Sequence, residues 1–91
     1  MKYVTTYTFK PFITKDEIRA LLAAFAEFGN APGTTAHYLR TDGGGGIVIG
    51  ESDDVVGMYR NVLRYLEFIE FESHVVLPVE DAVPVVLEVV S

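Results

Sequence analysis

The chain has 91 residues, 49% of them hydrophobic, and a mean hydropathy of +0.27. That length allows one domain, residues 1–91, and that composition excludes a disordered chain. Thirteen acidic and seven scattered basic residues give a net charge of -6. This charge argues against binding to nucleic acid or to an anionic membrane surface.

The chain has no cysteine. Disulfide frameworks, thiolate zinc sites and cysteine nucleophiles are therefore excluded, and the composition suits a reducing compartment. The first residues alternate in polarity and lack the apolar run of a signal peptide, so we expect a cytoplasmic protein. No apolar stretch approaches the roughly 20 residues that span a bilayer.

The first third of the chain predicts a strand followed by a helix. Residues 2–9 are rich in Tyr, Thr and Val, which favour strands, and Pro11 ends this run. Thr14 and Glu17 have the spacing of a capping box, so a helix is expected to begin there. Apolar residues then follow helical spacing as far as Phe28, and Gly29 is placed to end the helix.

The middle of the chain predicts a hairpin and a second helix. Residues 34–41 read as a strand, Asp42 and the glycines 43–46 as the turn, and residues 47–51 as a short third strand. Residues 52–54 are a helix cap, and the helix is expected to reach about Leu66. Its buried stripe is predicted to consist of Val55, Tyr59, Val62, Leu63 and Leu66.

The last third predicts a fourth strand over residues 69–79, with Ile69 and Phe71 on one face. Residues 80–90 leave two alternatives open. Glu80, Asp81 and Pro84 in a first turn favour a short C-terminal helix, whereas the five valines after Val79 favour a strand. The helix is the preferred interpretation.

This order of elements predicts an α+β fold, a ferredoxin-like β-α-β-β-α-β sandwich with a four-stranded antiparallel sheet. The strand order should be fourth, first, third, second, with both long helices on one face. The other face would be bare in a monomer, and the apolar tail adds surface that a monomer could hardly bury. We therefore expect a homodimer with opposed sheet faces, to which the C-terminal segment contributes.

Short segments along nearly the whole chain carry a family resemblance. They are residues 7–11 (YTFKP), 25–29 (FAEFG), 36–38 (AHY), 42–43 (DG), 45–46 (GG) and 51–54 (ESDD). The chain resembles an uncharacterised bacterial family of about ninety residues that is similar to the dimeric α/β-barrel superfamily. That superfamily includes cofactor-independent quinol-type monooxygenases, muconolactone-isomerase-like proteins and stress-responsive barrel proteins. The resemblance implies the fold, the dimer and a helix over residues 80–90.

Few residues suggest chemistry. The glycines 43–46 lie between two strands and lack the following helix that a phosphate-binding loop needs, so they are interpreted as a flexible hairpin. His37 and His74 are the two histidines, and neither has metal-ligand spacing, so we expect no metal and no cofactor. His37 is the weak catalytic candidate, because it lies in the family-like segment and could act as an acid or base near neutral pH.

The candidate ligand-binding residues are Tyr7, His37 and Tyr38. Neighbouring strand residues point to opposite faces, so only one of His37 and Tyr38 can face the dimer interior. We expect His37 there, between the sheet and the partner, and Tyr38 under the helices. A His37 side chain packed under the helices would leave an enzyme without its acid–base group.

Three functions remain open. The domain could bind a small apolar molecule or have a structural role, or it could be a cofactor-independent monooxygenase- or isomerase-like enzyme. It could also be an acidic interaction module that uses Glu67, Glu70 and Glu72 and the apolar C-terminal tail. A large pocket holding His37 and a tyrosine would favour the enzyme over the binding protein. A filled interior would favour the interaction module or a structural role.

Overall fold

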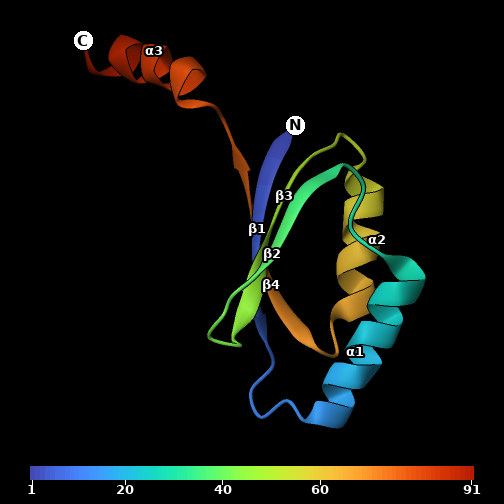
Figure 1. Ribbon diagram of the computed structural model, residues 1–91. Helices are drawn as coiled ribbons and strands as arrows, with labels where there is room; N and C mark the ends of the chain where they lie inside the picture. Colours follow the sequence, from blue (N-terminus) through green and yellow to red (C-terminus); the bar gives the residue numbers. More distant parts are fainter.

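The computed structural model describes residues 1–91 and contains four strands and three helices. In chain order these are β1 (Lys2–Phe9), α1 (Lys15–Phe28), β2 (Thr34–Leu39), β3 (Gly45–Glu51), α2 (Val55–Tyr65), β4 (Ile69–Val76) and α3 (Val79–Val90). The strands form one antiparallel sheet in the order β2-β3-β1-β4. Helices α1 and α2 lie on one face of this sheet (Figure 1). The predicted α+β ferredoxin-like fold, its strand order and the short C-terminal helix are confirmed.

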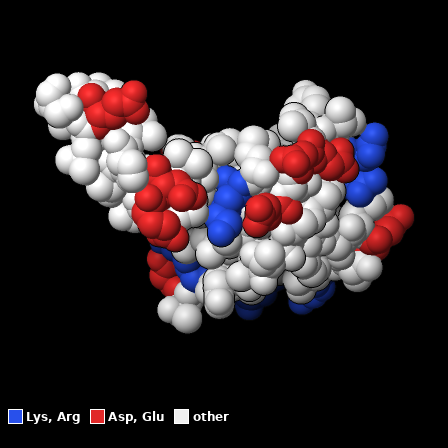
Figure 2. All heavy atoms as spheres, turned by 90° about the horizontal axis from the view of Figure 1, so that it is seen from above, with Lys and Arg blue, Asp and Glu red and all other residues white.

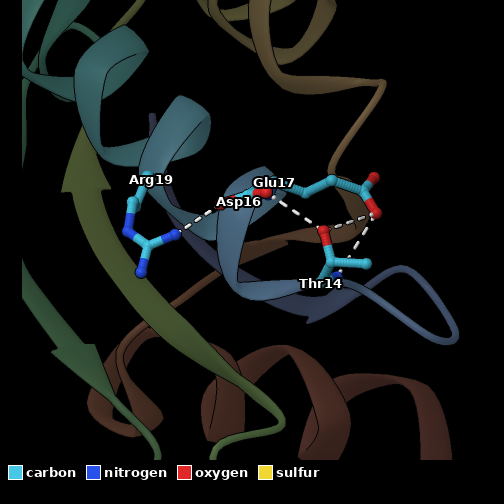
Figure 3. Close-up of polar contacts among 4 residues, drawn as sticks. All are labelled: Thr14, Asp16, Glu17 and Arg19. Carbon is cyan, nitrogen blue, oxygen red and sulfur yellow. Dashed lines mark hydrogen bonds and ion pairs between the residues drawn. The ribbon is translucent and has the colours of Figure 1, made fainter.

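Helix α1 begins at the predicted capping box (Figure 3). The backbone N–H of Glu17 donates to Thr14 Oγ1 at 3.1 Å, and the backbone N–H of Thr14 donates to Glu17 Oε1 at 3.3 Å. Lys10 also forms an ion pair with Glu17 and so attaches the helix start to the end of β1. Gly29 ends the helix with a φ of 71°, a backbone conformation that favours glycine.

The register of the sheet separates two faces of β1. Tyr3, Thr5 and Tyr7 are buried on the helix side, whereas Thr6 and Thr8 are exposed on the opposite side. Side chains alternate between the two faces along a strand, and helices α1 and α2 cover only one of these faces (Figure 1). Tyr7 pairs with Gly46 of β3 and with Phe71 of β4. The sheet thus aims the tyrosines of β1 at the helices.

Several predicted details differ from the structure. Strand β3 begins at Gly45 rather than at residue 47, β2 ends at Leu39, and β4 ends at Val76. The stripe predicted for α2 is correct at Val62 and wrong at its other four positions, which are all exposed: Val55, Tyr59, Leu63 and Leu66. The helix instead turns Met58, Val62 and Tyr65 toward the sheet. The Tyr65 hydroxyl donates to the Gly29 carbonyl oxygen at 2.8 Å, which fixes this rotation against the end of α1.

The helix layer contacts the sheet through one small apolar cluster, and little of the chain is buried. Only 11 of 91 residues are buried, and the buried apolar cluster contains Tyr7, Leu21, Tyr65, Phe68 and Ile69. The accessible surface is 6504 Å², against about 5,300 Å² for a compact monomer of this mass. The radius of gyration is 15.8 Å, against about 12 Å for a compact chain of this length.

Helix α3 accounts for part of this extended shape. It follows Leu77 and Pro78 at the end of β4 and projects away from the body of the domain (Figure 1). None of its residues is buried. Seen from above, this arm is mostly uncharged, and acidic and basic groups are scattered over the rest of the visible face (Figure 2). The helices are all too short or too polar to cross a bilayer.

Candidate functional site

A cleft of about 790 Å³ opens between the sheet and the two helices. The sheet contributes the side chains of alternate strand residues, among them Tyr3, Thr5, Tyr7, His37, Val48 and Phe71. The helices contribute Leu21, Leu22, Phe25, Met58, Val62 and Tyr65. Fifteen of the 22 lining residues are hydrophobic, and none is Asp, Glu, Lys or Arg. The cleft is therefore apolar and uncharged.

Two glycines of β3 position the tyrosines on the cleft floor. A Cβ built on Gly46 would lie 2.5 Å from Tyr7 Cζ and closer still to its hydroxyl oxygen. A Cβ on Gly50 would lie 2.6 Å from Tyr3 Cζ. Each tyrosine ring therefore crosses β3 over a glycine, and its hydroxyl reaches the far side of that strand. The Tyr3 hydroxyl donates a hydrogen bond to the Pro32 carbonyl oxygen at 3.0 Å.

The hydroxyl of Tyr7 ends on a histidine. It lies 2.6 Å from Nε2 of His37, and Nδ1 of His37 lies 2.9 Å from Oδ1 of Asn30. The imidazole also makes edge-to-face contacts with the rings of Tyr7 and Phe25, whose centroids are 5.6 Å and 5.7 Å away. Residues from β1, β2, α1 and the loop after α1 thus hold one polar group at the wall of an apolar cleft.

Burial keeps this pair uncharged at neutral pH. Desolvation raises the pKa of the Tyr7 hydroxyl above its usual value of about 10. Desolvation lowers the pKa of His37 below its usual value of about 6.5. At neutral pH Tyr7 is therefore a protonated phenol and His37 a neutral imidazole, and the two form an uncharged hydrogen-bonded pair.

The floor of the cleft holds a second polar pair. Oγ1 of Thr5 lies 2.7 Å from Oγ of Ser73, between β1 and β4. One of the two hydroxyl hydrogens is used between them, and the other is free to turn toward a neighbouring acceptor. This pair can therefore donate or accept a hydrogen bond.

The structure brings two of the three predicted ligand-binding residues together. Tyr7 and His37 meet in the cleft, whereas Tyr38 lies on the opposite face of the sheet with 63% of its surface exposed. The expected orientation is therefore reversed, because His37 lies on the helix side. The expected position of the site, between the sheet and a partner, is wrong for the same reason. The helix side is not a filled core, so His37 borders open space there.

Sequence reasoning missed three contributors to this site. Asn30 orients the imidazole, Phe25 packs against it, and Gly46 gives Tyr7 its path across β3. Two signals were available, since a glycine within a strand indicates close approach of another group, and Phe25 is on the apolar stripe of α1. Asn30 had no signal, because only the fold brings it to His37.

Of the other candidates, His74 lies outside the cleft and Gly43 is among its lining residues. His74 is on the bare face of β4, where its Nε2 lies 3.1 Å from Glu72 Oε1. Nowhere do three His, Cys, Asp or Glu side chains gather in a cluster that could hold a metal ion. Asp42 accepts from the backbone N–H of Gly44 at 2.8 Å and pairs with Arg40, so the glycine run begins in a tight turn. That turn leads directly into β3, which begins at Gly45.

Comparison with known proteins identifies the family of this chain. A search of curated proteins finds no match to this chain. A family model described as a domain of unknown function, DUF3303, matches residues 1–90. Because the match covers nearly the whole chain, the protein belongs to the DUF3303 family.

Proposed function

We propose that this domain binds a neutral, largely apolar small molecule in the cleft between its sheet and helices. The observation that carries the proposal is an uncharged cleft of about 790 Å³ with the Tyr7–His37 pair at its wall. Ligand pockets in proteins have volumes of roughly 300–1,000 Å³ and combine apolar walls with a few placed polar groups. Tyr7 and His37 are the proposed ligand-contacting residues.

The lining also supports a class of ligand. No basic side chain is present to pair with a carboxylate or phosphate, and no acidic side chain is present to pair with an amine. Burying an unpaired charge in such surroundings costs several kcal/mol or more. A neutral molecule of a few rings fits both the size of the cleft and its lack of charge.

Binding of Nile red, a neutral fluorophore whose emission reports its binding, tests this proposal. The affinity is compared between the wild type and two variants of adjacent β3 residues. Val48 faces the cleft and Ile47 faces the opposite side of the sheet. Val48→Phe fills the cleft and should weaken Nile red binding at least tenfold. Ile47→Phe adds a ring outside the cleft and should leave the affinity unchanged. Equal affinity in both variants and the wild type would place the dye elsewhere and refute the proposal.

A second candidate function is a cofactor-independent enzyme of the monooxygenase or isomerase type. It is favoured by the presence of His37 and Tyr7 in one cleft, 2.6 Å apart, which is the arrangement expected of the enzyme. It stands second because His37 lies on the helix side, where an enzyme was not expected to have its acid–base group. A neutral imidazole can accept a proton, and the tyrosine hydroxyl can pass one to it. The resemblance to quinol-type monooxygenases indicates the reaction to try first.

Dioxygen uptake with naphthohydroquinone tests this second candidate. Uptake by the wild type should exceed the spontaneous oxidation measured without protein, and His37→Leu should return it to that background. Tyr38→Phe, on the other face of the sheet, is the matched control and should behave as the wild type. Equal dioxygen uptake by the wild type and His37→Leu would refute the enzyme hypothesis and leave the binding proposal intact.

We also propose that the domain acts as a homodimer in the cytoplasm, with opposed sheet faces and a contribution from α3. The accessible surface exceeds that of a compact monomer by about 1,200 Å², and a standard interface removes about 800 Å² from each partner. The bare sheet face carries Tyr38, Ile47 and Ile49 beside polar residues of β4.

Helix α3 also supports the dimer. It has 12 residues, six of them valine, and Pro84 interrupts its hydrogen bonds. Such a helix is unstable alone in water and needs a surface to pack against.

Light scattering at micromolar concentration tests the dimer. The expected mass is twice that of the 10.1 kDa chain. Tyr38→Glu together with Ile47→Lys should shift the mass to that of one chain by placing charges on the bare face. A wild-type mass of one chain would refute the dimer without affecting the cleft.

A further inference from the structure

The hydrogen bonds around His37 take their direction from Asn30, whose amide oxygen faces the ring. The amide oxygen of Asn30 has no hydrogen, so the contact at 2.9 Å requires Nδ1 of His37 to donate. A neutral imidazole has one N–H, so Nε2 is then a bare acceptor. The Tyr7 hydroxyl, 2.6 Å from Nε2, must be the donor of that bond. Hydrogens therefore point from Tyr7 to His37 and from His37 to Asn30.

This direction determines what Tyr7 can offer to a ligand. A phenolic hydroxyl has a single hydrogen, and His37 takes it. Tyr7 lines the cleft, and its oxygen therefore retains only acceptor capacity. Tyr7 cannot easily turn away, because 6% of its surface is exposed and its ring is held over Gly46. The lowered pKa of His37 keeps Nε2 unprotonated at neutral pH and so maintains the arrangement.

We propose that the ligand of this cleft carries a hydroxyl or N–H group that donates a hydrogen bond to Tyr7 Oη, and that the site discriminates against ligands whose polar group is only a carbonyl or an ether. This inference rests on the proposed function, since it names the ligand class of the same cleft. A site built to pair with a ligand hydroxyl leaves a buried acceptor unpaired when that hydroxyl is absent. The Thr5–Ser73 pair can serve either kind of ligand, so the selectivity comes from Tyr7.

The test uses three naphthalenes that differ only in one substituent at the same ring position: naphthol, methoxynaphthalene and acetylnaphthalene. Each is titrated against protein loaded with Nile red. The wild type should bind naphthol about tenfold more tightly than acetylnaphthalene, a factor that one unpaired buried acceptor accounts for. Tyr7→Phe should remove this preference. Tyr38→Phe, which alters a hydroxyl on the opposite face, should retain it.

The decisive variant is His37→Leu. It removes the acceptor of the Tyr7 proton, so the Tyr7 hydroxyl becomes free to donate into the cleft. The preference for naphthol should then be lost, because a freed hydroxyl can donate to the carbonyl of acetylnaphthalene as well as accept from naphthol. A merely structural role of His37 would weaken all three ligands alike and would not change their order. Nitrogen chemical shifts of the His37 ring give a second measurement in the unmodified protein, and they should show a protonated Nδ1 and a bare Nε2.

The outcomes distinguish a failure of this inference from a failure of the proposed binding function. If Nile red and the naphthalenes all fail to bind, the proposed function is wrong and the inference falls with it. If they bind without a preference, or if Tyr7→Phe keeps the preference, the inference is wrong and the binding function stands. A wild-type preference for acetylnaphthalene, or a protonated Nε2, would show that the hydrogen bonds run in the opposite direction and would overturn the inference.

Discussion

Gly46 is the position at which one methyl group should disturb both the fold and the cleft. A Cβ at this position would lie 2.5 Å from Tyr7 Cζ and 2.5 Å from the Tyr38 carbonyl oxygen. The second of these atoms belongs to the backbone of β2 and cannot move without displacing that strand. The φ of Gly46 lies outside the left-handed region, so the cost of Gly46→Ala is steric rather than conformational.

The expected cost follows from two terms. Forcing extra volume into a packed site costs about 1–3 kcal/mol. Displacing Tyr7 also breaks its hydrogen bond to His37, which contributes about 1 kcal/mol. Gly46→Ala should therefore lower the free energy of unfolding by about 2–4 kcal/mol. It should also weaken Nile red binding, because the displaced ring enters the cleft.

Urea denaturation followed by tyrosine fluorescence measures the first effect. Gly44→Ala is the matched control, since a Cβ there meets only the flexible side chains of Asp42 and Arg40, at 3.1 Å or more. Its cost should stay below about 1 kcal/mol. A double variant, Tyr7→Leu with Gly46→Ala, should lose less stability than the two single changes added together. An unfolding midpoint of Gly46→Ala equal to that of Gly44→Ala would refute the steric argument.

Three further predictions concern the ends of the molecule and the cleft histidine. Thr14→Ala should lower the free energy of unfolding by about 1 kcal/mol, because it removes the acceptor for the Glu17 N–H; unchanged thermal stability would contradict this. Burial lowers the pKa of His37, so as the pH falls the unfolded chain takes up a proton on this residue before the folded chain does. The contribution of neutral His37 to the free energy of unfolding is therefore complete above about pH 6.5 and declines as the pH falls. Urea midpoints at pH 7.5 and pH 5 should therefore differ more in the wild type than in His37→Leu, and equal differences would rule out His37 as the cause. Deleting the residues after Asp81 should weaken the proposed dimer or cause aggregation, and light scattering that reports an unchanged dimer would exclude a role for α3.

Local signals were enough to predict most of the architecture. The capping box at Thr14 and Glu17 locates the start of α1 because both partners lie within one turn of the helix. The tyrosine- and threonine-rich run at residues 2–9 has the bounds predicted for β1. The order of strands and helices then leaves few ways to connect them, so the sheet order β2-β3-β1-β4 could be inferred before any coordinates.

Only the tertiary structure decided the details that depend on contacts between distant segments. The rotation of α2 was one, since the periodicity of its apolar residues fits more than one face and the Tyr65–Gly29 bond selects the one that is used. The face of His37 was another, because alternation along β2 fixes that His37 and Tyr38 are opposed but not which of them lies under the helices. Tyr7 and His37 are 30 residues apart in the chain and lie on separate strands. The register of β1 and β2 on either side of β3 brings the Tyr7 hydroxyl within 2.6 Å of His37 Nε2. The cleft itself has no sequence signal, because hydrophobic residues have the same spacing whether two layers touch or leave room for a ligand.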